Sequence, residues 1–212
     1  MFLPPVHAET DTAVLLQFIR ENPLGLLITG IKSSQNFLQC THVPFVLDTP
    51  EESTELAPKG RLRAHIAKKN PQVTAMIEGL ERKPSVLDIE DSVLVVFNGK
   101  HDHYVTPKYY VETKPDTGKV VPTWNYSAVQ NPQPWTVSDA PEKYIEFMQR
   151  NIVGIEIRIE EIQGKFKMSQ EMKPGDREGV VAGFAQMGGE TGEAISRLVR
   201  QRGALHDLKT RK

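Results

Sequence analysis

The chain has 212 residues, of which 39% are hydrophobic and 25% charged, a composition typical of a globular protein with one or two domains. Its 26 Lys and Arg residues are matched by 27 Asp and Glu residues, so a net charge of −1 gives no overall attraction to nucleic acid. A single cysteine excludes an intramolecular disulfide, and no apolar run approaches the ~20 residues that span a bilayer. The N-terminal residues also lack the pattern of a secretory signal, so we expect a cytoplasmic protein and do not exclude a nuclear one.

Hydrophobic periodicity predicts the elements of the first part of the chain. Residues 10–22 form a helical pattern, a buried strand is predicted over 24–31, and a second strand over 37–47 has Val43, Phe45 and Leu47 on one face. Residues 48–60 are small or charged and predict a loop. The next stretch, 61–66, alternates strictly between polar and apolar residues, which is typical of a half-buried strand.

A second helix is predicted after this strand. Asn70 and Pro71 are a favoured pair for the N-cap and first turn of a helix. The inward side of that helix is expected to carry Val73, Met76, Ile77 and Leu80. Residues 92–99 are apolar throughout their middle, as in a strand covered on both faces.

The remaining elements follow from the same patterns. The stretch "GKVVPTWNY" (118–126) is strand-like, but Pro122 cannot donate to a sheet ladder, so it predicts an edge strand or a bulge. A helix is predicted over 139–151, and an alternating strand over 154–162 that continues into 165–170. Two short C-terminal helices are predicted within 176–187 and 191–202. The whole chain, 1–212, is expected to be one domain, mainly β (α+β), with antiparallel strands and flanking helices.

The outward faces of these strands carry cations and aromatics. Each of the following lies opposite a predicted inward residue: His42 and Pro44, Arg61, Arg63 and His65, Trp124 and Tyr126, and Lys165, Lys167 and Ser169. A groove that collected several of these faces would offer charge for a phosphate and flat surface for a ring. The alternative is that each face is simply solvated, as outward strand faces commonly are.

Two smaller motifs suggest other chemistry. His101 and His103 have a spacing that metal sites use, but no third ligand lies nearby, and an exposed pair is the simpler interpretation. Cys40 precedes His42 on the same strand face, yet nothing completes a nucleophilic site, so we interpret Cys40 as a small buried residue. Neither the dinucleotide fingerprint nor the Walker pattern occurs.

Several motifs in fixed order resemble one known family. They are "MFLPPVH", "THVPFVLD" (41–48), "HIAKKNPQ" (65–72), "VLVVFNG" with "YVTPKYY", "GKVVPTWNY", "PWTVSDAPEKYI", "IVGIEIRIEEIQGKFKMSQ" (152–170) and "DREGVVAGF". The resemblance is to the PaiB-like FMN-binding negative transcriptional regulators and spans nearly the whole chain. It implies a split β-barrel of the flavin-reductase type with C-terminal helices, a homodimer with FMN between the subunits, and transcriptional repression.

The chain departs from this family at one connector. The resemblance implies a further strand and helix between Val129 and Pro134, where only "QNPQ" (130–133) is present. Either this protein lacks that strand and helix, or the sequence omits a disordered stretch at this point, and both alternatives leave the closure of that side of the barrel open.

The resemblance and the residue pattern together predict a site for FMN. The ring is expected near one strand with Thr41, His42, Val43 and Pro44 and a second with Thr123, Trp124, Asn125 and Tyr126. The phosphate is expected near His65, Lys68 and Asn70, at the start of the helix that Pro71 opens. Lys167 and Ser169 are expected to contribute from the late strand, from the same or the partner subunit.

Two classes of function follow from such a site, with a third that is weaker. A regulator would use FMN as a sensor or a structural group, and an oxidoreductase would pass hydride from NAD(P)H to the flavin. Haem binding is the third, suggested by related split barrels and six histidines. No helix-turn-helix is evident and the basic stretch 197–212 is a terminus expected to fray, so we expect weak, non-specific DNA binding that is mostly lost without the residues after Gly203.

Overall fold

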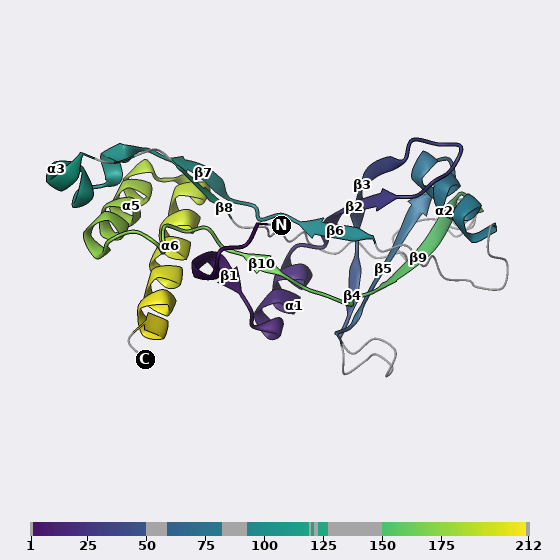
Figure 1. The fold of residues 1–212 in the computed structure, drawn as a ribbon, viewed down its shortest axis with the longest axis horizontal. Coiled ribbons are helices and arrows are strands. Elements are labelled where there is room, and N and C mark those ends of the chain that lie inside the picture. The colour runs from purple at the N-terminus through teal and green to yellow at the C-terminus, as the bar shows by residue number, and fades with distance from the viewer. Residues whose placement is uncertain are drawn as a thin grey trace. The chain divides into compact units, whose positions relative to one another are not determined.

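The computed structural model describes residues 2–49, 59–81, 93–118, 120, 123–126 and 150–210. The chain divides into two compact units (Figure 1). The barrel unit comprises Leu16–Asn98 and Gln130–Ile162, and the terminal unit comprises Met1–Leu15, Gly99–Val129 and Gln163–Lys212. The prediction of a single domain over residues 1–212 stays a prediction. The predicted helix over 139–151 and the loop at 50–58 lie outside the described residues.

The described residues of the barrel unit form antiparallel strands, helix α2 and the second part of helix α1 (Thr12–Glu21). Its elements are β2 (Leu24–Gly30), β3 (Leu38–Pro44), β4 (Val46–Asp48), β5 (Arg61–Ala67), α2 (Pro71–Glu81), β6 (Leu94–Phe97) and β9 (Ile152–Arg158). In one sheet β2 lies between β3 and β6, and in another β5 lies between β4 and β9. All of these pairings are antiparallel.

A bend at Phe45 joins the two sheets. β4 follows β3 directly, but the Phe45 N–H donates to the carbonyl of Pro23 at 2.7 Å instead of continuing either ladder. The strands therefore follow in the order β6, β2, β3, β4, β5, β9, where β3 continues into β4 at the bend. No pairing joins β6 to β9 among the residues that the structure describes. This is an α+β fold of the split-barrel kind, and the predicted fold class is confirmed.

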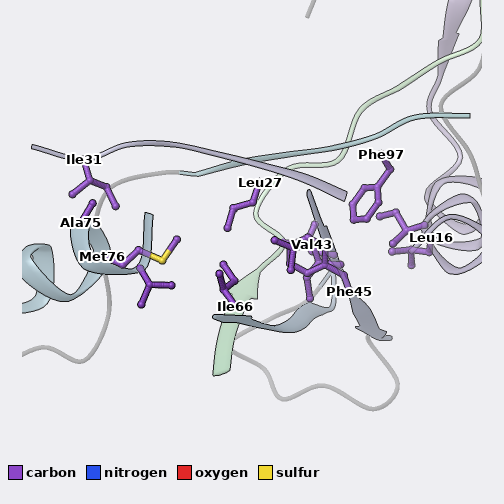
Figure 2. Close-up of a cluster of buried hydrophobic side chains, with 13 residues drawn as sticks. Leu16, Leu27, Ile31, Val43, Phe45, Ile66, Ala75, Met76 and Phe97 are labelled. Carbon is purple, nitrogen blue, oxygen red and sulfur yellow. The ribbon is translucent and has the colours of Figure 1, made fainter. Parts of the chain in front are cut away.

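The apolar core of the barrel unit lies inside this bent sheet (Figure 2). On β2 the alternation predicted from sequence is clear, because Gly25, Leu27 and Thr29 are buried and the residues between them are not. Val43 and Phe45 meet Leu27 from the next strand, and α2 adds Val73, Ala75 and Met76. Burial of this face determines the register, since a shift of one residue would expose it.

Three burial predictions in this unit were wrong. Cys40 is exposed, Leu94 is 57% exposed, and Ile77 is 43% exposed. Cys40 and Leu94 both pair with Ile28 on the side of the sheet that faces away from the core, so β6 is not covered on both faces. In α2 the side chain of Gln72 is buried instead of Ile77, and its amide donates to the Leu27 carbonyl and the Thr29 hydroxyl.

The terminal unit brings both ends of the chain together. Its elements are η1 (Pro5–His7), β1 (Ala8–Glu9), the start of α1 (Thr12–Glu21), β7 (Asp102–Val105), η2 (Pro107–Tyr109), α3 (Thr113–Thr117), β8 (Thr123–Tyr126), β10 (Gly164–Lys165), α5 (Pro174–Met187) and α6 (Gly189–Thr210). β1 pairs with β10 and β7 with β8, both antiparallel. No described helix in either unit combines the length and apolar character needed to cross a membrane.

Two expectations about the end of the chain were wrong. The strand expected to run from 154 through 170 is interrupted, because β9 ends at Arg158 and β10 covers only Gly164–Lys165, and the φ of +57° at Ser169 is incompatible with an extended run. The tail expected to fray is helical, since α6 continues to Thr210. It is held there by Arg177, which donates to the carbonyl of Gly203 and pairs with Asp207 at 2.6 Å.

Helices α5 and α6 form an antiparallel hairpin. They join at Gly188 and Gly189, whose φ values of 67° and 69° are in the left-handed region that favours glycine. The Ser196 hydroxyl donates to the Val181 carbonyl, and Arg177 meets Gly203, so the contacts run antiparallel along both helices. This geometry differs from a DNA-binding helix-turn-helix, in which the second helix crosses the first at a wide angle.

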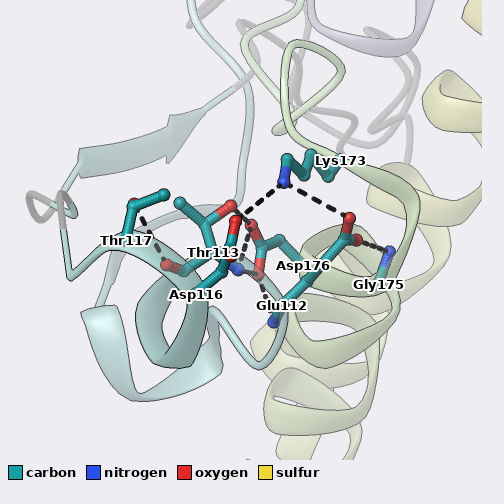
Figure 3. Close-up of polar contacts among 7 residues, drawn as sticks. All are labelled: Glu112, Thr113, Asp116, Thr117, Lys173, Gly175 and Asp176. Carbon is teal, nitrogen blue, oxygen red and sulfur yellow. Dashed lines mark hydrogen bonds and ion pairs between the residues drawn. The ribbon is translucent and has the colours of Figure 1, made fainter.

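Reciprocal capping fixes α3 to the start of α5 (Figure 3). Asp176, 1% exposed, accepts hydrogen bonds from the backbone N–H groups of Glu112 and Thr113 and from the Thr113 hydroxyl. In return the Glu112 carboxylate accepts the N–H of Gly175 at 2.8 Å. Lys173 lies within 3.7 Å of Glu112 and 3.6 Å of Asp116 and balances their charge.

Candidate functional site

In the barrel unit, Asn70 connects the start of α2 to β3. Its Oδ1 accepts the N–H of Gln72 at 2.9 Å, as an N-cap does, and its Nδ2 donates to the Thr41 hydroxyl at 3.1 Å. The predicted cap is therefore confirmed, and two of the predicted site residues, Thr41 and Asn70, lie in contact.

The cap changes how a phosphate could be held at this helix. The N–H groups of Val73 and Thr74 already donate to the Asn70 carbonyl, Gln72 donates to its side chain, and Pro71 has no N–H. Free backbone donors, the usual basis for anion binding at a helix start, are thus used up. A phosphate here would depend on the exposed side chains of His65 and Lys68.

The other predicted residues of β3 divide between its two faces. Val43 is 1% exposed and belongs to the core, so only its backbone is available to a ligand. His42 and Pro44 are exposed on the outward face, away from Thr41. The structure therefore keeps Thr41 with Asn70 and separates them from His42.

The arginines of the neighbouring strand are engaged elsewhere. Arg63 donates to both Asp48 oxygens, at 2.7 and 2.6 Å, and Arg61 lies 3.5 Å from the same carboxylate. The Arg63 hydrogen bonds and the charge of both arginines hold the pKa of Asp48 below its ordinary value, although its burial opposes this. These two cations stabilise the sheet edge.

In the terminal unit, four predicted site residues come together. Lys167 donates to the Thr123 hydroxyl, and the Ser169 hydroxyl donates to Asn125 Oδ1 at 3.1 Å. Asn125 and Ser169 are both 0% exposed. Thr123 and Asn125 lie two apart on β8 and so share one strand face, whereas the side chains of Trp124 and Tyr126 lie outside the described part of the structure.

Two residues that sequence reasoning missed extend this cluster. His7 Nε2 lies 3.0 Å from a Glu171 oxygen, and Lys167 lies 3.7 Å from the other oxygen of Glu171. Burial raises the pKa of Glu171, but the hydrogen bond from His7 and the charge of Lys167 outweigh it, so the carboxyl stays ionised below its usual range. The signal was present, because His7 ends "MFLPPVH" and Glu171 follows "KFKMSQ" directly.

A buried donor of this cluster points to a ligand. Asn125 Nδ2 is buried and has no hydrogen-bond partner. Buried polar atoms without a partner are uncommon and costly, so such a donor calls for an acceptor from outside the chain. A ring with carbonyl oxygens, such as that of a flavin, fits this donor.

No group of three or more His, Cys, Asp or Glu that could hold a metal occurs among the described residues. The two histidines of "HDHY" have separate surroundings. His101 contacts the Thr191 hydroxyl at 3.4 Å, and His103 packs edge-on against Phe184.

Residues 1–131 and 130–161 match a family described as "Putative FMN-binding domain". The chain belongs to this family, and FMN is the cofactor that it indicates. Three relatives extend the comparison. An uncharacterized protein of Aspergillus fumigatus and another of Emericella nidulans are each 47% identical, over 99% of this chain and 100% of theirs. The protease synthase and sporulation protein PAI 2 of Bacillus subtilis is 24% identical over 85% of this chain and 87% of its own, consistent with the PaiB-like resemblance.

The family match breaks at the short connector. Its two segments meet at 130–131, and the alignment to the Aspergillus fumigatus protein spans 261 positions against 212 residues here. The relatives thus contain residues that this chain lacks. The match also ends at 161, so Lys167 and Ser169 lie beyond it.

Proposed function

We propose that this protein holds FMN non-covalently in a homodimer, with the flavin ring at the β8 strand of the terminal unit. The observation that carries the proposal is the buried, unpartnered Asn125 Nδ2 in a cluster with Lys167 and Ser169. Bound flavin would supply electron or hydride transfer. The residues of the chain would bind it, orient it and shield it from water.

The direct test is a flavin titration of the protein and of a Lys68→Ala variant. The parent is expected to show a flavin absorbance spectrum and saturable FMN binding. If Lys68 contacts the phosphate, the variant should lose about tenfold in FMN affinity and little in riboflavin affinity, because charge-assisted hydrogen bonds contribute about 1.5–3 kcal/mol. Lys32→Ala removes the same charge from another exposed position and should leave both affinities unchanged. Equal FMN affinity in the Lys68→Ala variant would contradict the phosphate assignment alone.

The dimer is supported by the outward face of the β3–β2–β6 sheet. Leu24, Leu38 and Leu94 are 49%, 71% and 57% exposed on it, and an apolar sheet face of this kind is typical of an interface. A second copy of this chain is proposed to cover this sheet face, since two-fold pairs are the commonest assemblies. Light scattering should report twice the chain mass for the parent and one chain mass for Leu94→Glu. A monomeric parent at high concentration with FMN present would contradict the proposal.

Two roles are open to the bound flavin: gene repression, or hydride transfer from NADH or NADPH. The antiparallel α5–α6 hairpin and the net charge of −1 favour the second over direct reading of DNA. Anaerobic addition of NADH or NADPH to the yellow protein separates them. Rapid bleaching indicates an oxidoreductase, and an unchanged spectrum indicates a sensing or structural flavin.

Duplex DNA binding is proposed to be weak. With a net charge of −1, binding should fall in the non-specific range of about 10⁻⁴ to 10⁻⁶ M at physiological salt. The residues after Gly203 form the end of α6, so their removal would also break the Arg177–Asp207 pair. An Arg197→Ala, Arg200→Ala variant is therefore the cleaner test in fluorescence anisotropy. A sequence-specific complex of the parent with duplex DNA at nanomolar affinity would contradict the proposal of weak binding.

A further inference from the structure

A cleft of about 530 Å³, here called the α6 cleft, lies between the N-terminal segment and the last turns of α6. Residues from 5–14 line one side, residues from 202–209 line another, and Gln170 adds to the lining. All of them belong to the terminal unit, where β1 lies beside α6 (Figure 1). A cleft of this size is typical of a small-molecule site, and none of the residues assigned to the flavin above lines it.

The α6 side of the cleft is a single helix face. Its lining residues are Arg202, Leu205, His206 and Lys209. Counted from the first, the others lie three, four and seven positions along the helix, the spacing at which side chains lie one above another. The N-terminal segment adds the apolar residues Pro5, Val6, Ala8 and Val14. The cleft therefore combines basic side chains on one helix face with an apolar lining from the other segment.

A buried ion pair fixes the first of these basic side chains. Arg202 pairs with Glu9, and their side chains are 12% and 8% exposed. The Arg202 guanidinium also lies over the Phe166 ring, 3.4 Å from its centroid. Its Nε is buried and has no hydrogen-bond partner. Because such donors are seldom left unpaired in a native protein, an acceptor from outside the chain would complete this cation.

The carboxylates of the cleft are already used by the chain. Glu9 Oε1 accepts the N–H groups of the next two residues, at 2.9 and 3.0 Å, and Asp11 in turn caps the start of α1. In the part of the chain that the structure describes, the His206 ring and the Lys209 ammonium have no such partner. Ammonium and guanidinium groups donate hydrogen bonds and cannot accept them. The hydrogen-bonding capacity left in the cleft therefore favours an anion.

We propose that the α6 cleft binds a small organic acid with an apolar body. Its carboxylate would accept from Arg202, His206 and Lys209, and its body would pack against Val14 and Leu205. Charge-assisted hydrogen bonds to a carboxylate are the strong ones, and an apolar lining with a few polar groups is usual for such sites. The proposal goes beyond the flavin and does not rest on its binding.

The first test compares two probes that differ in one group. Calorimetric titrations of the parent use 2-naphthoate and 2-naphthamide, with excess FMN present so that neither probe reports on the flavin site. We expect a Kd for 2-naphthoate at or below about 1 mM, typical of a ligand of this size, and binding of the uncharged amide at least about tenfold weaker. Equal affinities, or no saturable binding of 2-naphthoate or octanoate at about 10 mM, would overturn the proposal.

A second test locates the site with a matched pair of exposed leucines on α6. Leu205 lines the cleft and Leu208 does not, and they are 41% and 62% exposed, so both aspartate variants should fold. Leu205→Asp places a negative charge beside the proposed carboxylate and should weaken 2-naphthoate binding at least about tenfold, whereas Leu208→Asp should stay within about twofold of the parent. Unchanged binding in Leu205→Asp, or equal losses in the two variants, would mean that the acid binds elsewhere.

A third test separates a binding role for Lys209 from a structural one. Lys209 lies in the last turn of α6, where a cation also complements the carbonyl end of the helix. If it holds the carboxylate, Lys209→Gln should bind 2-naphthoate about fivefold more weakly and 2-naphthamide unchanged. Arg200→Gln, at an exposed position of α6 outside the cleft, is the control for charge and should bind both probes as the parent does. A Lys209→Gln protein that is less stable but keeps the parent's affinity for the acid would contradict the carboxylate assignment.

Discussion

Replacement of Gly179 by alanine is expected to destabilise the terminal unit by about 3 kcal/mol, the upper part of the range for overpacking. A Cβ at this position would overlap the carbonyl oxygen of Tyr109 and meet Val111 Cγ2 at 3.2 Å. Tyr109 ends η2, which packs on α5, and a backbone carbonyl cannot turn aside as a side chain can. The gain in helix propensity, about 1 kcal/mol, offsets only part of the loss.

Denaturant unfolding of the variant checks this value. Gly154→Ala is the matched control, since nothing lies within 4 Å of a Cβ on that residue, and its stability should change by less than about 1 kcal/mol. A Gly179→Ala protein as stable as the parent would mean that η2 does not pack against α5 as closely as the structure has it.

Asp176→Ala is expected to cost a similar amount, about 3 kcal/mol. The substitution leaves the half-buried N–H groups of Glu112 and Thr113 and the Thr113 hydroxyl without their acceptor, and an unsatisfied group shielded from water costs about 1–3 kcal/mol. Asp116→Ala removes a carboxylate from the same cluster, but Asp116 is 63% exposed and should lose no more than about 0.5 kcal/mol. Comparable losses in the two variants would show that charge near Lys173, and not the buried capping, holds α3 to α5.

The same carboxylate makes stability depend on pH. Burial raises the pKa of Asp176, but the hydrogen bonds from Thr113 and Glu112 and the charge of Lys173 together bring it below 3.8, its ordinary value. A folded pKa below the unfolded one stabilises the protein fully above the unfolded pKa, and the stabilisation is lost as pH falls through the folded pKa. Glu9 and Glu171 have lowered pKa values too and add to the same trend. The melting temperature of the parent should therefore fall below about pH 4, and by less in Asp176→Ala.

Local patterns predicted the parts of the fold that depend on neighbours in sequence. The alternation in β5 and the cap at Asn70 are both properties of a few adjacent residues, and both are confirmed. The exposure of Cys40 depends instead on which side of the sheet the core occupies, which the strand itself does not encode. The bend at Phe45 likewise depends on a hydrogen bond to Pro23, 22 residues earlier.

The candidate site shows the same limit. The residues on β8 and the late strand were predicted individually, but the contact of Ser169 with Asn125 spans 44 positions, and that of His7 with Glu171 spans 164. No local periodicity reports on contacts that distant. Ser169 was expected on the outward face of an extended strand, whereas its backbone is left-handed and its side chain is buried. These residues meet only through the tertiary fold.

Calorimetric titration of the purified protein with FMN is the most direct test of FMN binding by this chain. We expect saturable, non-covalent binding of about one FMN per chain with a Kd at or below about 10 µM, and release of the flavin on denaturation. No saturable heat at about 100 µM FMN, together with a purified protein that shows no flavin absorbance, would contradict it.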